Sequence, residues 1–192
     1  MKEIIFASKN KGKIKEAQEI LKEFKIISIK ELGIDIDIEE DKETFEENAI
    51  KKAETIAKEL NGKICMADDS GIEIEYLDRF PGVHTKRWHQ GSDRERNLAI
   101  LEKLQGVPKE KRKIDFITVI VLSDGEKTIC RKGVISGYVS ETIRGDNGFG
   151  FDEIFELENG MTLAELSNEE KNSISARKIA IEEIRKELIK SI

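Results

Sequence analysis

Short apolar runs alternate with amphipathic segments in the first half of the chain. Residues 4–7 and 25–29 are apolar runs of strand length. Between them, residues 14–24 place apolar side chains three and four positions apart, which is the spacing of one helix face. A second such segment follows Thr44, which with Glu47 three positions later is typical of a helix start, and Ser92 with Glu95 predicts another. This alternation predicts an α/β sheet with flanking helices.

Hairpin patterns prevail in the second half of the chain. Strands are predicted at 114–122, 127–130 and 134–139, with a turn at 123–125. Near the C-terminus, Ser167 and Glu170 have the spacing of a capping box and predict one long amphipathic helix through Leu188. Because hairpins follow the helical segments, we expect a mixed sheet.

The polar sequence Asp68-Asp69-Ser70-Gly71 directly follows an apolar run at 64–67. These residue types favour turns, so the segment is predicted to end one strand before another begins at Ile72. In open α/β sheets, ligands bind beyond the carboxyl ends of strands, which makes the same residues candidates for a site. If the strand continues instead, neighbouring side chains face opposite ways and the two aspartates do not form a close pair.

The first predicted helix begins among residues suited to binding phosphate. Asn10 is a candidate N-cap, with Ser8 and Lys13 close by in a segment that contains three lysines. Amides at a helix start and adjacent cations favour anions. The spacing differs from that of a Walker phosphate loop. A capped helix with solvated lysines is the alternative interpretation.

Two further stretches are candidates for ligand binding. The acidic run 39–41 is either a solvated loop or the source of a carboxylate that joins Asp69 on a cation, for which Mg²⁺ is suited. The loop 145–152 contains glycines, two phenylalanines and aspartates. Glycine lets a backbone approach a ligand and phenylalanine can stack on a base, whereas a simple surface loop explains two exposed aromatic side chains poorly.

Composition limits the class of protein. A chain of 192 residues can bury one good-sized core, and we predict a single domain of two lobes over residues 1–192. The 33 basic and 39 acidic residues give a net charge of −6, which argues against broad binding to nucleic acid or to an anionic membrane.

The longest apolar run is too short to span a bilayer and no leader precedes the first strand, so a cytoplasmic location is expected. Cys65 and Cys130 are expected to be buried thiols without a disulfide.

Six motifs occur in order and together cover nearly the whole chain. They are Ser8-x-Asn10-x-x-Lys13, Thr44-Phe45-Glu46-Glu47-Asn48-Ala49, Ala67-Asp68-Asp69-Ser70-Gly71, Phe149-Gly150-Phe151-Asp152, Glu170-Lys171 and Ile174-Ser175-x-Arg177. Each is weak alone, but the ordered set resembles the inosine triphosphate pyrophosphatase family. The resemblance implies an elongated mixed α/β fold with two lobes around a central nucleotide-binding cleft, a homodimer, and Mg²⁺ as cofactor. It also implies hydrolysis of ITP, dITP or XTP to the monophosphate and pyrophosphate.

The same resemblance implies roles for individual residues. Asp69 would be the base for the attacking water and a metal ligand, with Glu39 as the second metal carboxylate. Lys42 stands where the family usually has glycine, which leaves the choice between Glu39 and Glu40 open. Substrate contacts are expected from Ser8, Asn10, Lys13, Lys52, Ser70, Arg87, Phe149, Gly150, Phe151, Asp152, Lys171 and Arg177.

Two other departures from the family pattern bear on base recognition. Ala176 stands where the family usually has histidine, so one base contact is missing or supplied elsewhere, and Glu153 replaces a proline. A non-catalytic nucleotide sensor is one alternative, although retention of Glu39, Asp69 and Lys13 argues against it. A Maf-type pyrophosphatase with another base preference is a second, disfavoured by the N-terminal motif. A nucleic-acid-binding module is a third, disfavoured by the acidic total and the lack of interleaved aromatic and basic residues.

Overall fold

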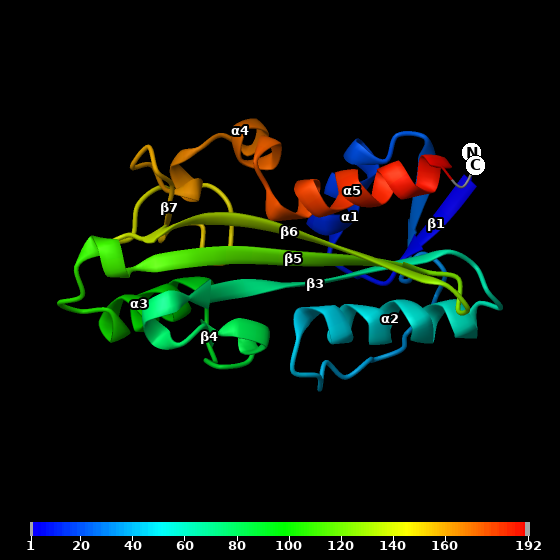
Figure 1. Ribbon diagram of the computed structural model, residues 1–192, viewed down its shortest axis with the longest axis horizontal. Coiled ribbons are helices and arrows are strands. Elements are labelled where there is room, and N and C mark those ends of the chain that lie inside the picture. The colour runs from blue at the N-terminus through cyan, green and yellow to red at the C-terminus, as the bar shows by residue number, and fades with distance from the viewer. Residues whose placement is uncertain (1, 191–192) are drawn as a thin grey trace. The chain divides into compact units, whose positions relative to one another are not determined.

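The computed structural model describes residues 2–190, which form two compact units (Figure 1). The first unit comprises the chain up to residue 70, residues 118–133 and the chain from 176 onward; the second comprises 71–117 and 134–175. Whether the two units act as lobes of one domain stays a prediction. No helix within residues 2–190 is long and apolar enough to cross a membrane.

One sheet holds the strands, and its pairing is mixed, as predicted. The strands are β1 (Lys2–Phe6), β2 (Phe24–Ser28), β3 (Cys65–Ile74), β4 (Phe80–Pro81), β5 (Lys113–Ser123), β6 (Thr128–Val139) and β7 (Phe155–Glu156). Their order is β2-β1-β3-β5-β6-β7, with β4 paired to β3. β1 is parallel to both β2 and β3, whereas the β3–β4 and β6–β7 pairs are antiparallel.

Residues 2–190 contain five α-helices, four of which begin at a side-chain cap. They are α1 (Lys11–Ile20), α2 (Phe45–Glu59), α3 (Asp93–Lys103), α4 (Asn168–Ser173) and α5 (Ala176–Lys190), with short 3₁₀ turns at Glu75–Leu77, Gly82–His84, Lys109–Lys111 and Leu163–Glu165. Asn10, Thr44, Ser92 and Ser167 each cap a helix through a side-chain oxygen that accepts backbone N–H bonds. Such caps are each worth about 1 kcal/mol and explain why these helices begin where the sequence predicts.

The first unit packs helices on both faces of its strands. α1 and α5 cover one face, where Phe6, Leu21 and Ile184 are buried together. α2 covers the other face, where Ile5, Ile56 and Cys65 are buried. β3 therefore has a helical layer on each side within this unit, and alternate side chains of the strand face different helices.

The second unit has its own apolar core. Ile72 and Ile74 of β3, Ile100 and Leu104 of α3, and Phe155 of β7 are buried together. This core fixes α3 against the segment that leads into β7. The arrangement matters because the loop 145–152 lies in that segment.

The structure corrects the predicted break at Asp68–Gly71. β3 continues through this stretch as one strand of ten residues, so Asp68 and Asp69 lie in mid-strand and not at a strand end. The sequence favoured a turn because aspartate is costly to bury in a strand. Here the buried carboxylate of Asp68 is paired with Lys13 and Arg177, which removes that cost.

Three further boundaries differ from prediction. Phe24 begins β2, because α1 ends at Ile20 and does not extend to residue 24. The strands predicted at 127–130 and 134–139 are one strand, β6, in which Gly133 is required because a Cβ there would lie 2.0 Å from the Ala176 carbonyl oxygen. The predicted long C-terminal helix is two helices, since α4 ends in the second unit and α5 begins where the chain enters the first.

Candidate functional site

The start of α1 places three predicted phosphate ligands on one short segment. Asn10 caps the helix, and its Oδ1 accepts N–H bonds from Gly12 at 2.9 Å and Lys13 at 3.2 Å. The Ser8 hydroxyl accepts the N–H of Asn10 at 3.2 Å. The cap thus occupies two of the amides that the sequence analysis offered to a phosphate. An anion at the start of α1 would therefore be bound chiefly by cationic and hydroxyl side chains.

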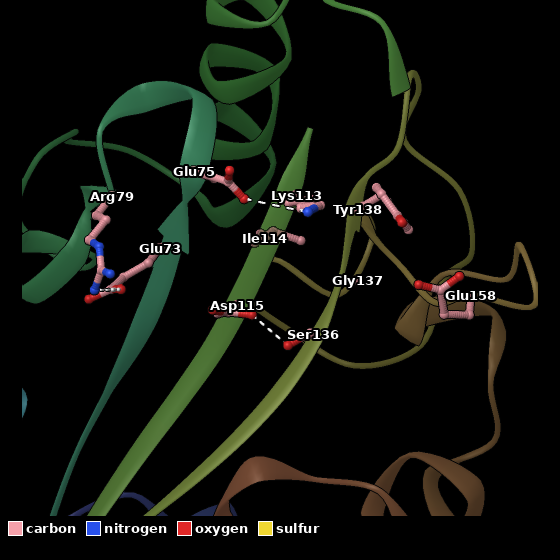
Figure 2. Close-up of a pocket in the computed structure, with 10 residues that line it drawn as sticks. All are labelled: Glu73, Glu75, Arg79, Lys113, Ile114, Asp115, Ser136, Gly137, Tyr138 and Glu158. Atoms are coloured by element: carbon pink, nitrogen blue, oxygen red, sulfur yellow. Dashed lines mark hydrogen bonds and ion pairs between the residues drawn. The ribbon is translucent and has the colours of Figure 1, made fainter. Parts of the chain in front are cut away.

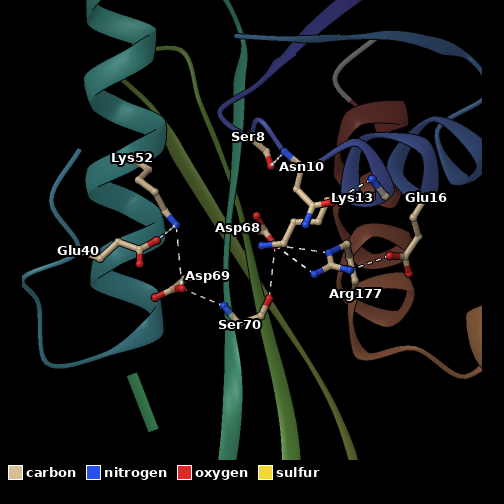
Figure 3. Close-up of polar contacts among 11 residues, drawn as sticks. Ser8, Asn10, Lys13, Glu16, Glu40, Lys52, Asp68, Asp69, Ser70 and Arg177 are labelled. Carbon is tan, nitrogen blue, oxygen red and sulfur yellow. Dashed lines mark hydrogen bonds and ion pairs between the residues drawn. The ribbon is translucent and has the colours of Figure 1, made fainter. Parts of the chain in front are cut away.

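Asp68 lies at the centre of a buried ion cluster on the α1–α5 face of β3 (Figure 3). Its Oδ2 is 2.8 Å from Lys13 Nζ and 3.3 Å from Arg177 Nη2, and Arg177 Nη1 donates to Glu16 at 2.7 Å. Burial alone would raise the pKa of Asp68, but Lys13, then Arg177, hold it well below the ordinary value. Asp68 is therefore a charged, fully paired group.

Asp69 faces the opposite way, toward α2 (Figure 3). Its Oδ1 accepts the N–H of Ser70 at 2.9 Å and lies 4.0 Å from Lys52 Nζ. Its Oδ2 is buried and accepts no hydrogen bond of normal geometry among the described residues, although the Asn48 side chain lies near enough to lower the pKa of the carboxyl. Burial raises the pKa of Asp69, and nearby Glu40 adds to this effect while Lys52 opposes it. An acceptor oxygen left unpaired in a buried position is costly unless a ligand or ion meets it.

Glu40, and not the predicted Glu39, is the carboxylate in contact with this group. Glu40 Oε1 is 2.6 Å from Lys52 Nζ, which joins it to Asp69 (Figure 3). Glu39 is exposed, and its backbone carbonyl accepts a bond from Lys51 Nζ at 2.8 Å. Within residues 2–190, no three histidine, cysteine, aspartate or glutamate side chains are grouped closely enough to form a complete metal site. A metal here would take its remaining ligands from substrate and water.

The second unit brings together Phe149, Asp152 and Lys171. Asp152 Oδ2 accepts the N–H of Phe149 at 2.8 Å and lies 2.5 Å from Lys171 Nζ. Lys171 Nζ is also 4.5 Å from the centre of the Phe149 ring, which is 62% exposed. Burial raises the pKa of Asp152, and Lys171 opposes that effect. Gly148 is needed beside this pair, because a Cβ at its φ of +87° would lie 2.1 Å from Asp152 Oδ2.

The other residues predicted to contact substrate either lie with the aspartates of the first unit, lie in the second unit, or have contacts outside both groups. Ser70 donates its hydroxyl to Asp68 Oδ2 at 3.3 Å, in the first unit. Phe151 is buried in the core of the second unit and does not present its ring to solvent. Arg87, also in the second unit, is exposed, and its Nη2 donates to the Val83 carbonyl at 3.4 Å. Arg177 was predicted with the base-recognition residues, but its contacts place it in the Asp68 cluster.

Several residues that position these groups are not predicted by the sequence patterns. Glu16 pairs with Arg177 and lies one helical turn after Lys13, a spacing that could have identified it. Asp93 and Asn97 of α3 hold the backbone of Gly150. Their capped helix was predicted, but their contact with a loop more than fifty residues away was not.

A separate pocket lies in the second unit, lined by residues of β3, β5 and β6 (Figure 2). Its cations are already paired: Lys113 with Glu75 at 3.9 Å and Arg79 with Glu73 at 3.3 Å. The lining contains none of the residues predicted to bind substrate, within the part of the chain that is described. We therefore do not assign the nucleotide to it.

Comparison with known proteins gives full-length matches. The sequence model described as the Ham1 family matches residues 4–187. A dITP/XTP pyrophosphatase of Clostridium perfringens is 44% identical over 98% of each chain. Solved structures of a HAM1 protein from Coxiella burnetii and the Ham1 protein of Staphylococcus aureus each align with a TM-score of 0.91 at 39% identity. These alignments cover 99% and 100% of this chain, respectively, and all of each solved chain.

Proposed function

Because this chain belongs to the Ham1 family, we propose that it hydrolyses deaminated purine nucleoside triphosphates to the monophosphate and pyrophosphate. The predicted family relationship and the α/β class are both confirmed by the full-length matches. We propose ITP, dITP and XTP as the substrates. From the family resemblance we further propose that the protein is a cytoplasmic homodimer that requires neither a membrane nor nucleic acid.

The observation that carries the proposal is the buried, unpaired oxygen of Asp69 next to Lys52, with Lys13 and Arg177 on the opposite face of β3. Three cations (Lys13, Lys52 and Arg177) accompany four carboxylates (Glu16, Glu40, Asp68 and Asp69). A triphosphate would be repelled by this excess of negative charge unless a divalent cation bound with it. The composition of the cluster therefore supports a substrate that arrives with a metal ion.

Mg²⁺ fits the donors present, since it commonly takes one or two carboxylates plus substrate phosphates and waters. Asp69 would hold it through Oδ2, with a second carboxylate from Glu40 or Glu39; the contact with Lys52 supports Glu40. When bound, the ion would neutralise phosphate charge and polarise the phosphorus that is attacked.

The side chains of the chain supply the other requirements of the reaction. Asp69, whose raised pKa reflects burial, would accept the proton of a water aligned on the α-phosphorus. Lys13 and Lys52 would hold the pyrophosphate that leaves, with Ser8 and Asn10 beside them. To do so, Lys13 must exchange part of its contact with Asp68 for a phosphate oxygen. Positioning and charge stabilisation of this kind carry most phosphoryl-transfer catalysis.

Base selection is assigned to the group in the second unit. A purine with a 6-oxo group presents an acceptor that Lys171 can meet, while the 6-amino group of adenine presents a donor that leaves the lysine unpaired. Loss of a buried polar match discriminates by about 10⁴-fold in favourable cases. The exposed ring of Phe149 would stack on the base. Arg177 would have to leave Asp68 and Glu16 to reach a base, so its role there stays a prediction.

The test is steady-state turnover of a panel of triphosphates with Mg²⁺, in which pyrophosphate and phosphate are measured separately. We expect pyrophosphate from ITP, dITP and XTP, and little from ATP, whose 6-amino group leaves Lys171 unpaired. Release of phosphate alone, or equal turnover of ATP and ITP, would exclude the proposed activity. The panel also separates a catalyst from a nucleotide sensor, which would release neither product.

A further inference from the structure

Two residues in the first turns of α3 form hydrogen bonds with the backbone N–H and carbonyl of Gly150, which follows Phe149 in the loop 145–152. Asp93 Oδ2 accepts the N–H of Gly150 at 2.7 Å, and Asn97 Nδ2 donates to the Gly150 carbonyl at 3.0 Å. Asn97 is fully buried and also donates to Glu153 Oε2 at 3.1 Å. Both partners of its amide nitrogen are acceptors, which fixes the orientation of the amide group. The backbone N–H and carbonyl of Gly150 are therefore both bonded to a helix of eleven residues.

The flanks of the loop are held by other contacts, since Asn147 Nδ2 donates to the Leu166 carbonyl at 3.0 Å and Phe151 is buried. Gly150 itself has a φ of +66° and no atom within 4 Å of where a Cβ would lie, so the bonds from Asp93 and Asn97 act on an uncrowded peptide. Phe149 is 62% exposed, and its ring contacts Lys171 by a cation–π interaction. The orientation of that ring thus depends on the backbone at 149–150. A glycine turn without a partner would sample several conformations.

Asp93 also acts on the neighbouring carboxylate. The pKa of Asp152 is raised first by burial, and the charge of Asp93 adds to the shift. Asp152 Oδ2 in turn accepts the N–H of Phe149 and pairs with Lys171. Two consecutive backbone N–H groups, at 149 and 150, are therefore bound by carboxylates from two different elements. Together they determine where the ring and the ammonium group lie.

We propose that Asp93 and Asn97 are positioning residues for base recognition, which act by holding the Gly150 peptide so that Phe149 and Lys171 face the base together. This inference rests on the proposed function. Neither residue touches the substrate. Their contribution is preorganisation: a loop already held in its binding conformation loses less entropy when the nucleotide binds.

A purely structural role for Asp93 predicts a different outcome. Asp93 lies in the first turn of α3, where an acid favours the helix dipole, and it pairs with Arg96. Loss of that role would lower the thermal midpoint and the active fraction, and so reduce kcat for every substrate with KM unchanged. Loss of positioning raises KM for the nucleotide and narrows base discrimination.

The experiment compares Asp93→Ala with Asp93→Asn and with Glu95→Ala as a matched control. Glu95 lies in the same turn and closes the Ser92 capping box, and its carboxylate accepts hydrogen bonds from the Ser92 N–H and hydroxyl. We expect Asp93→Ala to raise KM for ITP and to lower the ITP/ATP ratio of kcat/KM, each by about tenfold. Asp93→Asn keeps an acceptor for the Gly150 N–H and should stay within about threefold of wild type. Glu95→Ala should lower the thermal midpoint without changing KM or the ratio.

Binding of inosine monophosphate, measured by calorimetry, separates failure of this inference from failure of the proposed activity. If the wild-type protein binds this nucleotide but does not hydrolyse ITP, the activity is wrong and about tenfold weaker binding by Asp93→Ala still supports positioning. Unchanged KM, ratio and affinity in Asp93→Ala, or equal changes in Glu95→Ala, would overturn the inference. Asn97→Ser, checked for folding by circular dichroism, is expected to reproduce the loss of discrimination.

Discussion

Asp68 and Asp69 are adjacent and chemically identical, yet the two faces of β3 give them opposite surroundings (Figure 3). Asp68 is met by two cations and a hydroxyl, and its pKa is lowered. Asp69 has one cation at 4.0 Å and one oxygen without a partner, and its pKa is raised. A pleated strand can therefore give two adjacent carboxylates opposite surroundings, one neutralised by cations and one left with an unpaired oxygen.

The largest effect is expected from Asp69→Asn. This change removes the proposed metal ligand and base, so kcat for ITP should fall by about 10³-fold. The thermal midpoint should hold, because the lost charge was buried without a full set of partners. Pyrophosphate release measures the fall in kcat, and thermal denaturation measures the midpoint. Full turnover by the purified variant would remove Asp69 from the mechanism.

Asp68→Ala is expected to act in the opposite way, so that its main effect is a lower free energy of unfolding and not a lower kcat. Lys13 and Arg177 would be left buried without their shared partner, which costs about 3 kcal/mol of unfolding free energy. Denaturant unfolding measures this. Glu16→Gln is the matched control: it leaves the Asp68 pair intact, keeps an acceptor for Arg177, and should cost about 1 kcal/mol. Equal losses in both variants would mean that Asp68 is not the centre of the cluster.

Two variants test whether Glu40 or Glu39 supplies the second proposed metal carboxylate beside Asp69. Glu40→Gln is expected to raise the Mg²⁺ concentration for half-maximal activity by about tenfold, since Glu40 shares Lys52 with Asp69. Glu39→Gln should change it less, because its side chain is exposed. Activity titrated with Mg²⁺ distinguishes them. The opposite order would restore Glu39, as the family resemblance implied.

The smallest effect is expected at the cysteines, which lie outside both groups. Cys65 is buried and Cys130 is half-buried, and both are free. Burial raises the pKa of each thiol to about 11, so little reactive thiolate exists at neutral pH. Treatment of the native protein with a maleimide should leave both thiols unmodified and change kcat/KM by less than about twofold. Rapid inactivation would place a thiol near the site.

Elements that depend on local chemistry were predicted well from the sequence. Asn10, Thr44 and Ser92 begin helices through bonds to residues two or three positions away. The mixed sheet followed from the order of helical and hairpin patterns. Boundaries failed where a distant contact overrides local preference, as at Gly133, which lies in mid-strand beneath the start of α5.

The candidate site divides in the same way. The sequence by itself identified the candidate residues: two aspartates after an apolar run, lysines at a helix start, and a glycine loop with aromatic side chains. Only the tertiary structure decided which aspartate is neutralised, because Arg177 reaches Asp68 from 109 positions away. It also decided that α3 holds the Gly150 loop. The physical reason is that charge pairing and desolvation depend on distances in space, which local residue patterns do not encode.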